Sequence, residues 1–162
     1  MSLTVKITAP IFEKLSDLKE EYGFNELGLA VSGGSDSLAM LYICNDWAQK
    51  NKVKLHCLTV DHKLRSESAK EAELVANHCS GLGINHEIVE WKHEGNISGN
   101  LSDSARSARY KLIDKWRKEL SFVLVGHTKN DQIETFFMNL KRGSGIEGLK
   151  GMPLSFKRPE GY

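Results

Sequence analysis

Six consecutive residues are the strongest candidates for chemistry in this chain of 162 residues. They are Ser32, Gly33, Gly34, Ser35, Asp36 and Ser37. They lie between an apolar run and a helix-like stretch. Adjacent glycines let the backbone turn sharply and point successive N–H groups into one concavity, and the helix that follows adds the positive end of its dipole. This arrangement is typical of a phosphate-binding turn, to which the serines add hydroxyl donors.

Asp36 is the unusual member of this turn, because a carboxylate beside a phosphate is repulsive unless a cation bridges the two. We therefore expect Mg²⁺ at Asp36. The spacing excludes a Walker A loop, since no lysine follows the glycines. The alternative is a serine-rich turn in which Asp36 only caps the helix.

A second polar cluster follows the next apolar run. Asp61 and His62 are candidates for contacts with a nucleoside, and Arg65 for a contact with phosphate. The alternative is a polar loop whose Ser66 caps the next helix.

Arg109 lies on a helix-like stretch beside an apolar face. That face consists of Leu101, Ala105, Ala108, Leu112 and Trp116. A guanidinium directed from there toward the sheet would form a bidentate clamp on a phosphate. Spacing alone favours an ordinary surface arginine.

The third cluster follows the fourth apolar run. Asp131 and Glu134 share a helix face, which gives a negative site for a metal or an ammonium group. His127 is placed to donate to a developing negative charge or to act as a base. The alternative for Asp131 is a first-turn acid that stabilises the helix dipole.

A string with the spacing G-x-G-x-x-G begins at Gly143, but it follows a helix rather than a strand, so the dinucleotide interpretation fails. We expect a flexible glycine loop with Lys141 and Arg142 available to nucleic-acid phosphates. A simple helix stop at Gly143 is the competing interpretation.

Alternating strand-like and helix-like segments must position these clusters. The strands are expected at residues 27–31, 55–61, 84–91 and 122–127, and the helices at 37–50, 66–82, 101–120 and 131–141. A further helix at 11–22 starts after Pro10. The alternation predicts an α/β fold, a doubly wound parallel sheet with helices on both faces and ligands at the carboxyl ends of its strands.

Composition sets broader limits. With 40% apolar residues, the chain fits one compact domain. It has no signal pattern and no apolar run near the roughly 20 residues of a membrane span, so we expect a cytoplasmic protein with no membrane partner. Cys44, Cys57 and Cys79 are expected to be buried free thiols.

Charge is unevenly distributed along the chain, although the net charge is only +1. Residues 1–105 carry 10 basic and 15 acidic side chains, and residues 106–162 carry 12 basic and 6 acidic ones. The basic second half either gathers nucleic-acid phosphates or forms solvated helix faces.

The turn SGGSDS resembles the loop of the N-type ATP pyrophosphatases, the PP-loop enzymes of the adenine nucleotide alpha hydrolase-like fold. With VDHKLRSES, ARSARY and GHTKNDQIETFFMNLKRGSGIEGLKGM, the chain resembles the tRNA(Ile)-lysidine synthases over about residues 31–152. The last motif is the most specific.

The resemblance implies ligation of L-lysine to C2 of the wobble cytidine of tRNA(Ile) with a CAU anticodon, through an adenylated intermediate. It implies ATP bound by residues 32–37 and Mg²⁺ at Asp36. Arg109 and His127 would meet the triphosphate or the adenylate, and Asp131 and Glu134 would bind lysine.

Two features depart from the family pattern. Asn130 stands where the family more often has Asp. The chain also stops at Tyr162, whereas members of the family continue into domains that grip the tRNA. We expect a helical extension at 1–23 and a catalytic domain at 24–162.

Several alternatives stay open on the sequence. A tRNA-thiolating enzyme has a lysine where Ser35 stands, and paired cysteines that this chain lacks. Amidotransferase-linked synthetases leave the block 127–152 unexplained. A non-catalytic ATP-binding module would need little beyond the phosphate loop. The sequence leaves the oligomeric state open, with a homodimer as one option.

Overall fold

The computed structural model describes residues 3–63, 68–92 and 101–152. The chain divides into two compact units, Met1–Val125 and Gly126–Tyr162, and each is described by itself.

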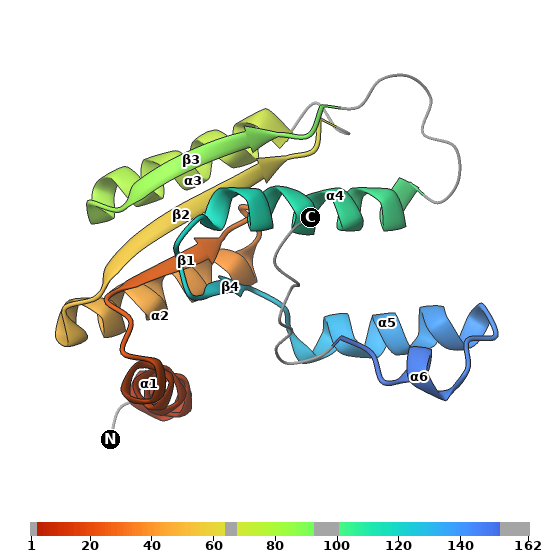
Figure 1. The fold of residues 1–162 in the computed structure, drawn as a ribbon, viewed down its shortest axis with the longest axis horizontal. Coiled ribbons are helices and arrows are strands. Elements are labelled where there is room, and N and C mark those ends of the chain that lie inside the picture. Colours follow the sequence, from red (N-terminus) through yellow and green to blue (C-terminus); the bar gives the residue numbers. More distant parts are fainter. Residues whose placement is uncertain (1–2, 64–67, 93–100, 153–162) are drawn as a thin grey trace. The chain divides into compact units, whose positions relative to one another are not determined.

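A four-stranded parallel sheet forms the centre of the first unit (Figure 1). Its strands are β1 (Glu26–Ala30), β2 (Lys54–Asp61), β3 (Asn85–Glu90) and β4 (Val123–Val125). Their spatial order is β3-β2-β1-β4, and every pairing is parallel. The chain moves outward from β1 to β3 and then returns to the other side of β1. This reversal makes the carboxyl end of β1 the switch point at which such sheets bind ligands.

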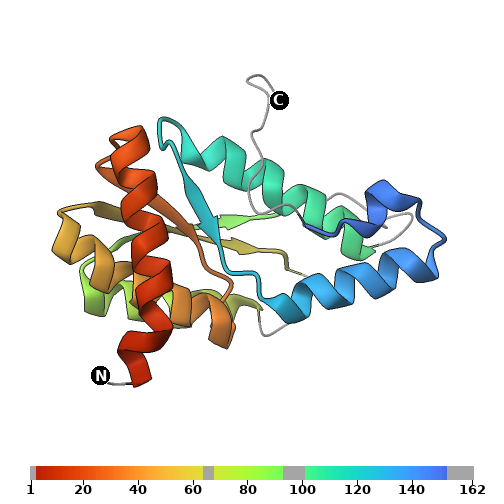
Figure 2. The same ribbon diagram turned by 90° about the horizontal axis from the view of Figure 1, so that it is seen from below.

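Helices cover both faces of this sheet. They are α1 (Leu3–Tyr22), α2 (Ser35–Asn51), α3 (Ser68–Leu82) and α4 (Leu101–Arg117). Figures 1 and 2 show α4 on the face opposite to α2 and α3. Right-handed crossovers produce this division, because β1, β2 and β3 follow one direction and β4 lies on the opposite side of β1. The predicted doubly wound parallel sheet is therefore confirmed.

Most element boundaries differ from the sequence expectation by one to three residues, and three of the differences bear on the sites. α1 starts at Leu3 and continues through Pro10, where one backbone hydrogen bond is lost but the helix is not interrupted. α2 starts at Ser35, so it takes up half of the phosphate turn. β4 ends at Val125, so His127 lies beyond the strand.

The core of the first unit lies between the sheet and the helices. Its largest fully buried side chains are Trp47, Leu27, Leu29, Leu41 and Leu58. Trp47 also donates from Nε1 to Ser16 Oγ at 3.0 Å, which anchors α1 on α2. The three cysteines are buried and free, as predicted, and burial raises the pKa of Cys44 to about 12.

Gly28 lets α4 approach β1 closely. A Cβ atom there would lie 2.9 Å from Val123 Cγ2, 3.1 Å from the Trp116 ring and 3.2 Å from Leu120 Cδ1. Gly28→Ala is therefore expected to lower the free energy of unfolding by about 1–3 kcal/mol, the usual cost of overpacking. Chemical denaturation measures this free energy of unfolding. Gly81→Ala is the control, because its Cβ would meet nothing within 4 Å. Equal stability of the two variants would contradict the close packing.

The second unit contains α5 (Lys129–Lys141) and α6 (Ile146–Leu149). α5 ends in a Schellman motif: Gly143 has φ +69°, its N–H donates to Leu140 O, and the Ser144 N–H donates to Asn139 O. The helix-stop interpretation of Gly143 is thus correct.

Within the described residues, none of the helices combines the length and apolar composition that crossing a membrane requires.

Candidate nucleotide-binding site

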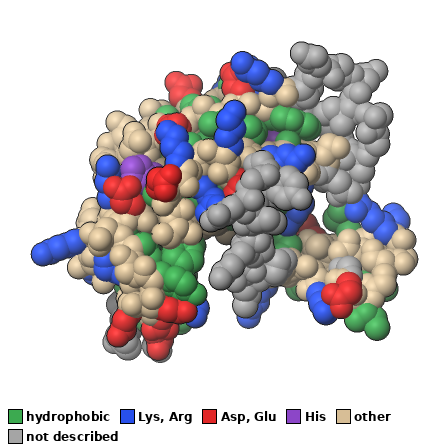
Figure 3. All heavy atoms as spheres, viewed as in Figure 1, with side chains coloured by type: hydrophobic (Ala, Val, Ile, Leu, Met, Phe, Trp, Pro, Cys, Tyr) green, Lys and Arg blue, Asp and Glu red, His purple; other side chains and the backbone are tan. Residues whose placement is uncertain are grey.

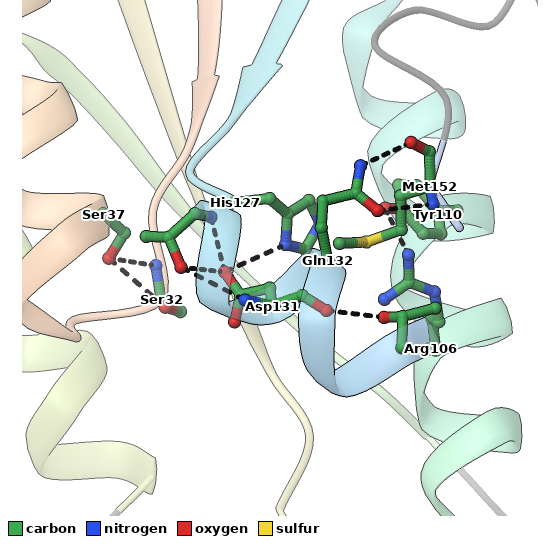
Figure 4. A network of polar contacts seen from close by, with 10 residues as sticks. Ser32, Ser37, Arg106, Tyr110, His127, Asp131, Gln132 and Met152 are labelled. Carbon is green, nitrogen blue, oxygen red and sulfur yellow. Dashed lines mark hydrogen bonds and ion pairs between the residues drawn. The ribbon is translucent and has the colours of Figure 1, made fainter. Parts of the chain in front are cut away.

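The turn after β1 is held in shape by Ser37, which is buried (Figure 4). Its Oγ accepts from the Ser32 N–H at 3.2 Å and donates to Gly34 O at 2.9 Å. Because the single hydroxyl proton goes to Gly34, the 3.2 Å contact between the two serine oxygens is donated by Ser32. Ser37 therefore closes the loop and has no proton left for a phosphate.

Gly33 has φ +90°, a conformation that side chains rarely adopt. A Cβ at this position would lie 3.1 Å from Glu71 O and 3.2 Å from Glu71 Cβ, in the first turn of α3. Glycine is therefore required for two reasons, the backbone conformation and the close approach to α3.

Backbone donors are left open at the start of α2. The N-cap is Gly34, without a side-chain cap, and no hydrogen bond within the described residues occupies the N–H groups of residues 33–36. Ser35 and Asp36 are exposed. Asp36 lies inside the first turn rather than at the cap, so the alternative of a capping Asp36 is wrong. Unoccupied N–H groups at a helix N-terminus form a binding site for an anion.

A buried threonine fixes where this turn begins. Thr59 on β2 donates from Oγ1 to Val31 O at 2.9 Å, and the Val31 N–H donates to Leu58 O. β2 therefore holds the last residue before the phosphate turn.

Asp61, at the end of β2, is buried and serves its own loop. Its Oδ1 accepts from the Lys63 N–H at 2.8 Å. Burial acts to raise the pKa of Asp61, but hydrogen bonds from Lys63 and Ser68 outweigh it and lower the pKa. The carboxylate thus stays charged and ties the chain to α3. The predicted phosphate ligand Arg65 and the predicted cap Ser66 lie outside the described residues.

His62, directly after β2, and Arg109 of α4 are brought together. The Arg109 Nε donates to His62 Nε2 at 3.2 Å, and the His62 ring packs edge-on against Trp91 with 5.8 Å between ring centroids. Arg109 is half-buried and lies in line with Ala105 and Ile113, both buried, so it belongs to the buried stripe of α4. The surface-arginine alternative is therefore wrong.

The charge of Arg109 has no acidic partner among the described residues. Burial and the neighbouring Arg106 lower the pKa of Arg109, while Tyr110 acts in the opposite direction. Arg106 itself lies over the Tyr110 ring at 5.4 Å. A half-buried guanidinium without a carboxylate favours an anionic ligand.

In the second unit, Asp131 closes a capping box at the start of α5. Its Oδ2 accepts from the N–H and the Oγ1 of Thr128, and the Asp131 N–H donates back to Thr128 Oγ1. His127 Nδ1 lies 4.0 Å from the same oxygen. Asp131 therefore has the structural role of a first-turn acid, and Glu134 is exposed one turn further on.

A side-chain clamp closes the second unit (Figure 4). Gln132 Oε1 accepts from the Met152 N–H at 2.8 Å, and Gln132 Nε2 donates to Met152 O. Gly151, directly before Met152, has φ +72°, and a Cβ there would lie 2.6 Å from Gln132 Oε1. Lys141 and Arg142, the proposed tRNA contacts, are exposed at the end of α5.

Charged side chains are mixed on one face of the molecule. Figure 3 shows acidic and basic side chains interspersed on the face that it presents.

Within the described residues, no group of three or more His, Cys, Asp or Glu is arranged to hold a metal ion. A Mg²⁺ ion at Asp36 would therefore need phosphate oxygens as further ligands, which is how this ion is commonly bound beside nucleotides.

Sequence reasoning missed three residues of these sites. Thr128 heads a T-x-x-D capping signature that was readable from the sequence. Trp91 and Thr59 had no such signal, because their roles depend on which strands become neighbours.

A family model described as PP-loop domain matches residues 7–160. A tRNA(Ile)-lysidine synthase of Wolbachia pipientis wMel is 46% identical over 132 residues, covering 79% of this chain. That of Ruegeria pomeroyi is 47% identical over 128 residues, covering 78%. The chain spans about 30% of the length of both relatives.

Two solved structures share the fold. A U34-tRNA thiolase from Methanococcus maripaludis has a TM-score of 0.67 at 21% identity, over 76% of this chain and 46% of its own. An NH3-dependent NAD synthetase from Campylobacter jejuni has a TM-score of 0.58 at 16% identity, over 93% of this chain and 77% of its own.

Proposed function

The chain belongs to the PP-loop domain family, and we propose that it uses ATP to attach L-lysine to C2 of the wobble cytidine of tRNA(Ile) with a CAU anticodon. The observation that carries the ATP chemistry is the open row of N–H groups at residues 33–36. The names of the relatives support the choice of tRNA and product.

The proposed reaction has two steps. The cytidine C2 oxygen attacks the α-phosphorus of ATP, and the bond to pyrophosphate breaks. A lysine amine then attacks C2, the C2–O bond breaks, AMP leaves with that oxygen, and the amine nitrogen loses its proton to solvent. Negative charge grows on the phosphates in the first step, so donors fixed around them accelerate it.

Each candidate residue has a part in this proposal. The backbone of residues 32–37 holds the triphosphate. Asp36 would hold Mg²⁺, which would neutralise charge on the phosphate oxygens. Arg109 binds the α-phosphate or the adenylate. His127, in the second unit, donates to negative charge on a phosphate. Asp61 and His62 border the nucleotide from the end of β2. Asp131 and Glu134 bind an ammonium group of lysine, and Lys141 and Arg142 bind tRNA phosphates.

Transfer of radiolabelled lysine tests this function. With ATP and Mg²⁺, the protein is expected to label a CAU-anticodon tRNA(Ile) transcript and release one AMP and one pyrophosphate per lysine. A matched transcript with another wobble base is the control. Modification of a different nucleoside, with no lysine incorporated, would reject the assignment.

Thiolation is the second candidate, because the thiolase of Methanococcus maripaludis shares the fold. All three cysteines here are buried, and the described residues offer no set of ligands for a metal cluster. The chain itself gives thiolation no further support.

Two substitutions separate the capping role of Asp131 from its proposed role toward lysine. Thr128→Val removes the hydroxyl that caps α5 and keeps the charge of Asp131. The helix is therefore expected to lose about 1 kcal/mol of stability, which amide hydrogen exchange measures. Asp131→Asn keeps an acceptor for the Thr128 N–H and loses the charge, so the KM for lysine is expected to rise about tenfold or more, the effect of losing one charged hydrogen bond. The KM for ATP should not change with Asp131→Asn. An equal rise in both KM values would contradict a lysine site.

A further inference from the structure

The imidazole of His62 lies between Trp91 of the segment after β3 and Arg109 of α4. The arginine Nε–H can only donate, so His62 Nε2 must be the acceptor of their 3.2 Å hydrogen bond. The proton of the neutral ring is therefore on Nδ1. That atom is buried and has no hydrogen-bond partner in the part of the chain that the structure describes.

This contact orients the guanidinium while leaving its binding groups available. Arg109 has five N–H donors in a rigid planar fork, and Nε provides only one. No hydrogen bond among the described residues occupies the two terminal amino groups. A hydrogen bond at Nε restrains the orientation of the whole fork, and an oriented fork is what bidentate binding of a phosphate requires.

The choice of histidine also preserves the charge of the arginine. Half-buried arginines are commonly held by carboxylates, which orient them equally well but cancel most of their charge. A neutral imidazole orients the group without neutralising it. The described residues provide no acidic partner for Arg109, so its full positive charge remains for a ligand.

We infer that His62 is a positioning residue, which holds the Arg109 fork in the plane that binds a phosphate of ATP. This inference rests on the proposed function. It differs from a direct contact between His62 and the nucleoside, because all of the effect of His62 would pass through Arg109.

The role requires a neutral ring, which makes it depend on pH. The charged groups that act on His62 among the described residues are Arg109 from α4 and Asp61 from β2. Burial, and then Arg109, lower the pKa of His62 below its usual 6.5, while Asp61 opposes them. A proton on Nε2 would remove the acceptor and place a second positive charge against Arg109. ATP binding should therefore weaken as the pH falls through this lowered pKa.

A double-mutant cycle on Mg-ATP affinity tests the inference, measured by calorimetry at pH 8. His62→Phe keeps an aromatic ring beside Trp91 and removes the acceptor, so the affinity is expected to fall about tenfold, a typical effect of one charge-assisted hydrogen bond. The double variant with Arg109→Met should bind as weakly as Arg109→Met alone. Additive losses would show an independent contact of His62 and overturn the inference.

His62→Gln supplies a conservative rescue, because its side-chain oxygen can take the place of Nε2. This variant is expected to bind ATP within about threefold of the wild type and to lose the weakening at acid pH. Affinity as low as that of His62→Phe would overturn the inference. The control is His78→Gln. His78 of α3 forms an exposed hydrogen bond with Tyr42 of α2, so this substitution should not alter the affinity for ATP.

The tautomer of His62 gives a readout that does not depend on ATP. Imidazole ¹⁵N spectra of the ligand-free protein should show the proton on Nδ1 in the wild type. A proton on Nε2 would overturn the inference whatever the activity. If the wild type binds no ATP, the proposed function fails, while the tautomer still decides whether His62 holds Arg109.

Discussion

Arg109→Met is expected to slow pyrophosphate release by about 100-fold or more, the usual loss when one fixed donor to a developing charge is removed. The folded protein should be at least as stable as the wild type, and more stable by up to about 1 kcal/mol, because a half-buried charge without a described carboxylate partner is replaced by an apolar side chain. Loss of activity with gain of stability is the signature of a residue retained for binding.

Arg117→Met is the matched control, since it makes the same change on the same helix. Arg117 donates from Nε to Asp114 at 2.9 Å, an ion pair within one turn at the end of α4. Its loss should change stability by less than about 0.5 kcal/mol and leave pyrophosphate release unaltered. Stopped-flow release assays and thermal unfolding measure both variants. If Arg109→Met destabilises the fold and retains activity, Arg109 is a structural residue.

Much of this fold follows from periodicity in the sequence. β1, β2 and β4 contain short apolar stretches, and the helices between the strands carry buried residues on one face, so the alternation is sufficient to predict a parallel sheet. Helix ends were harder to place. α1 continues through Pro10, and burial of Leu15 in the core supports the helix beyond that residue. α2 begins two residues earlier than expected, at Ser35.

The candidate site was predictable to the extent that its residues follow strands. The phosphate turn and His62 follow strands and were identified from their types and positions, whereas the role of Arg109 was indicated by the family resemblance. Their contacts were not, because a pair such as His62 and Arg109 is 47 residues apart and meets only through the crossover that places α4 against β2. Spacing alone favoured a surface position for Arg109, and the rotation of α4 about its axis decides otherwise.

Local hydrogen bonding explains why some polar residues have structural roles that their types did not reveal. Ser37 and Asp61 were identified as ligand contacts, yet each uses its side chain to close its own loop. Short polar side chains near turns bond to the backbone a few residues away, and the same residue types serve ligand sites. The backbone N–H groups that these side chains leave open are the donors the proposal assigns to phosphate.

Gly33→Ala is expected to weaken Mg-ATP binding by about 100-fold or more, since several backbone donors are displaced together. The added Cβ would lie 3.1 Å from Glu71 O and 3.2 Å from Glu71 Cβ. These atoms are the backbone oxygen and the Cβ of Glu71. Neither can be moved by a side-chain rotation. The loop must instead move off α3, and the N–H groups of residues 33–36 then no longer point at one anion.

Gly83→Ala separates this effect from simple backbone strain. Gly83 has φ +69°, and its Cβ would meet nothing within 4 Å. Both variants are expected to lose about 1–3 kcal/mol of stability from the positive φ, but only Gly33→Ala should lose ATP affinity. Calorimetry with Mg-ATP and chemical denaturation measure the pair. If Gly33→Ala retained wild-type affinity, the nucleotide would have to bind outside this turn, since no rearranged loop could keep the same donors on the same phosphate.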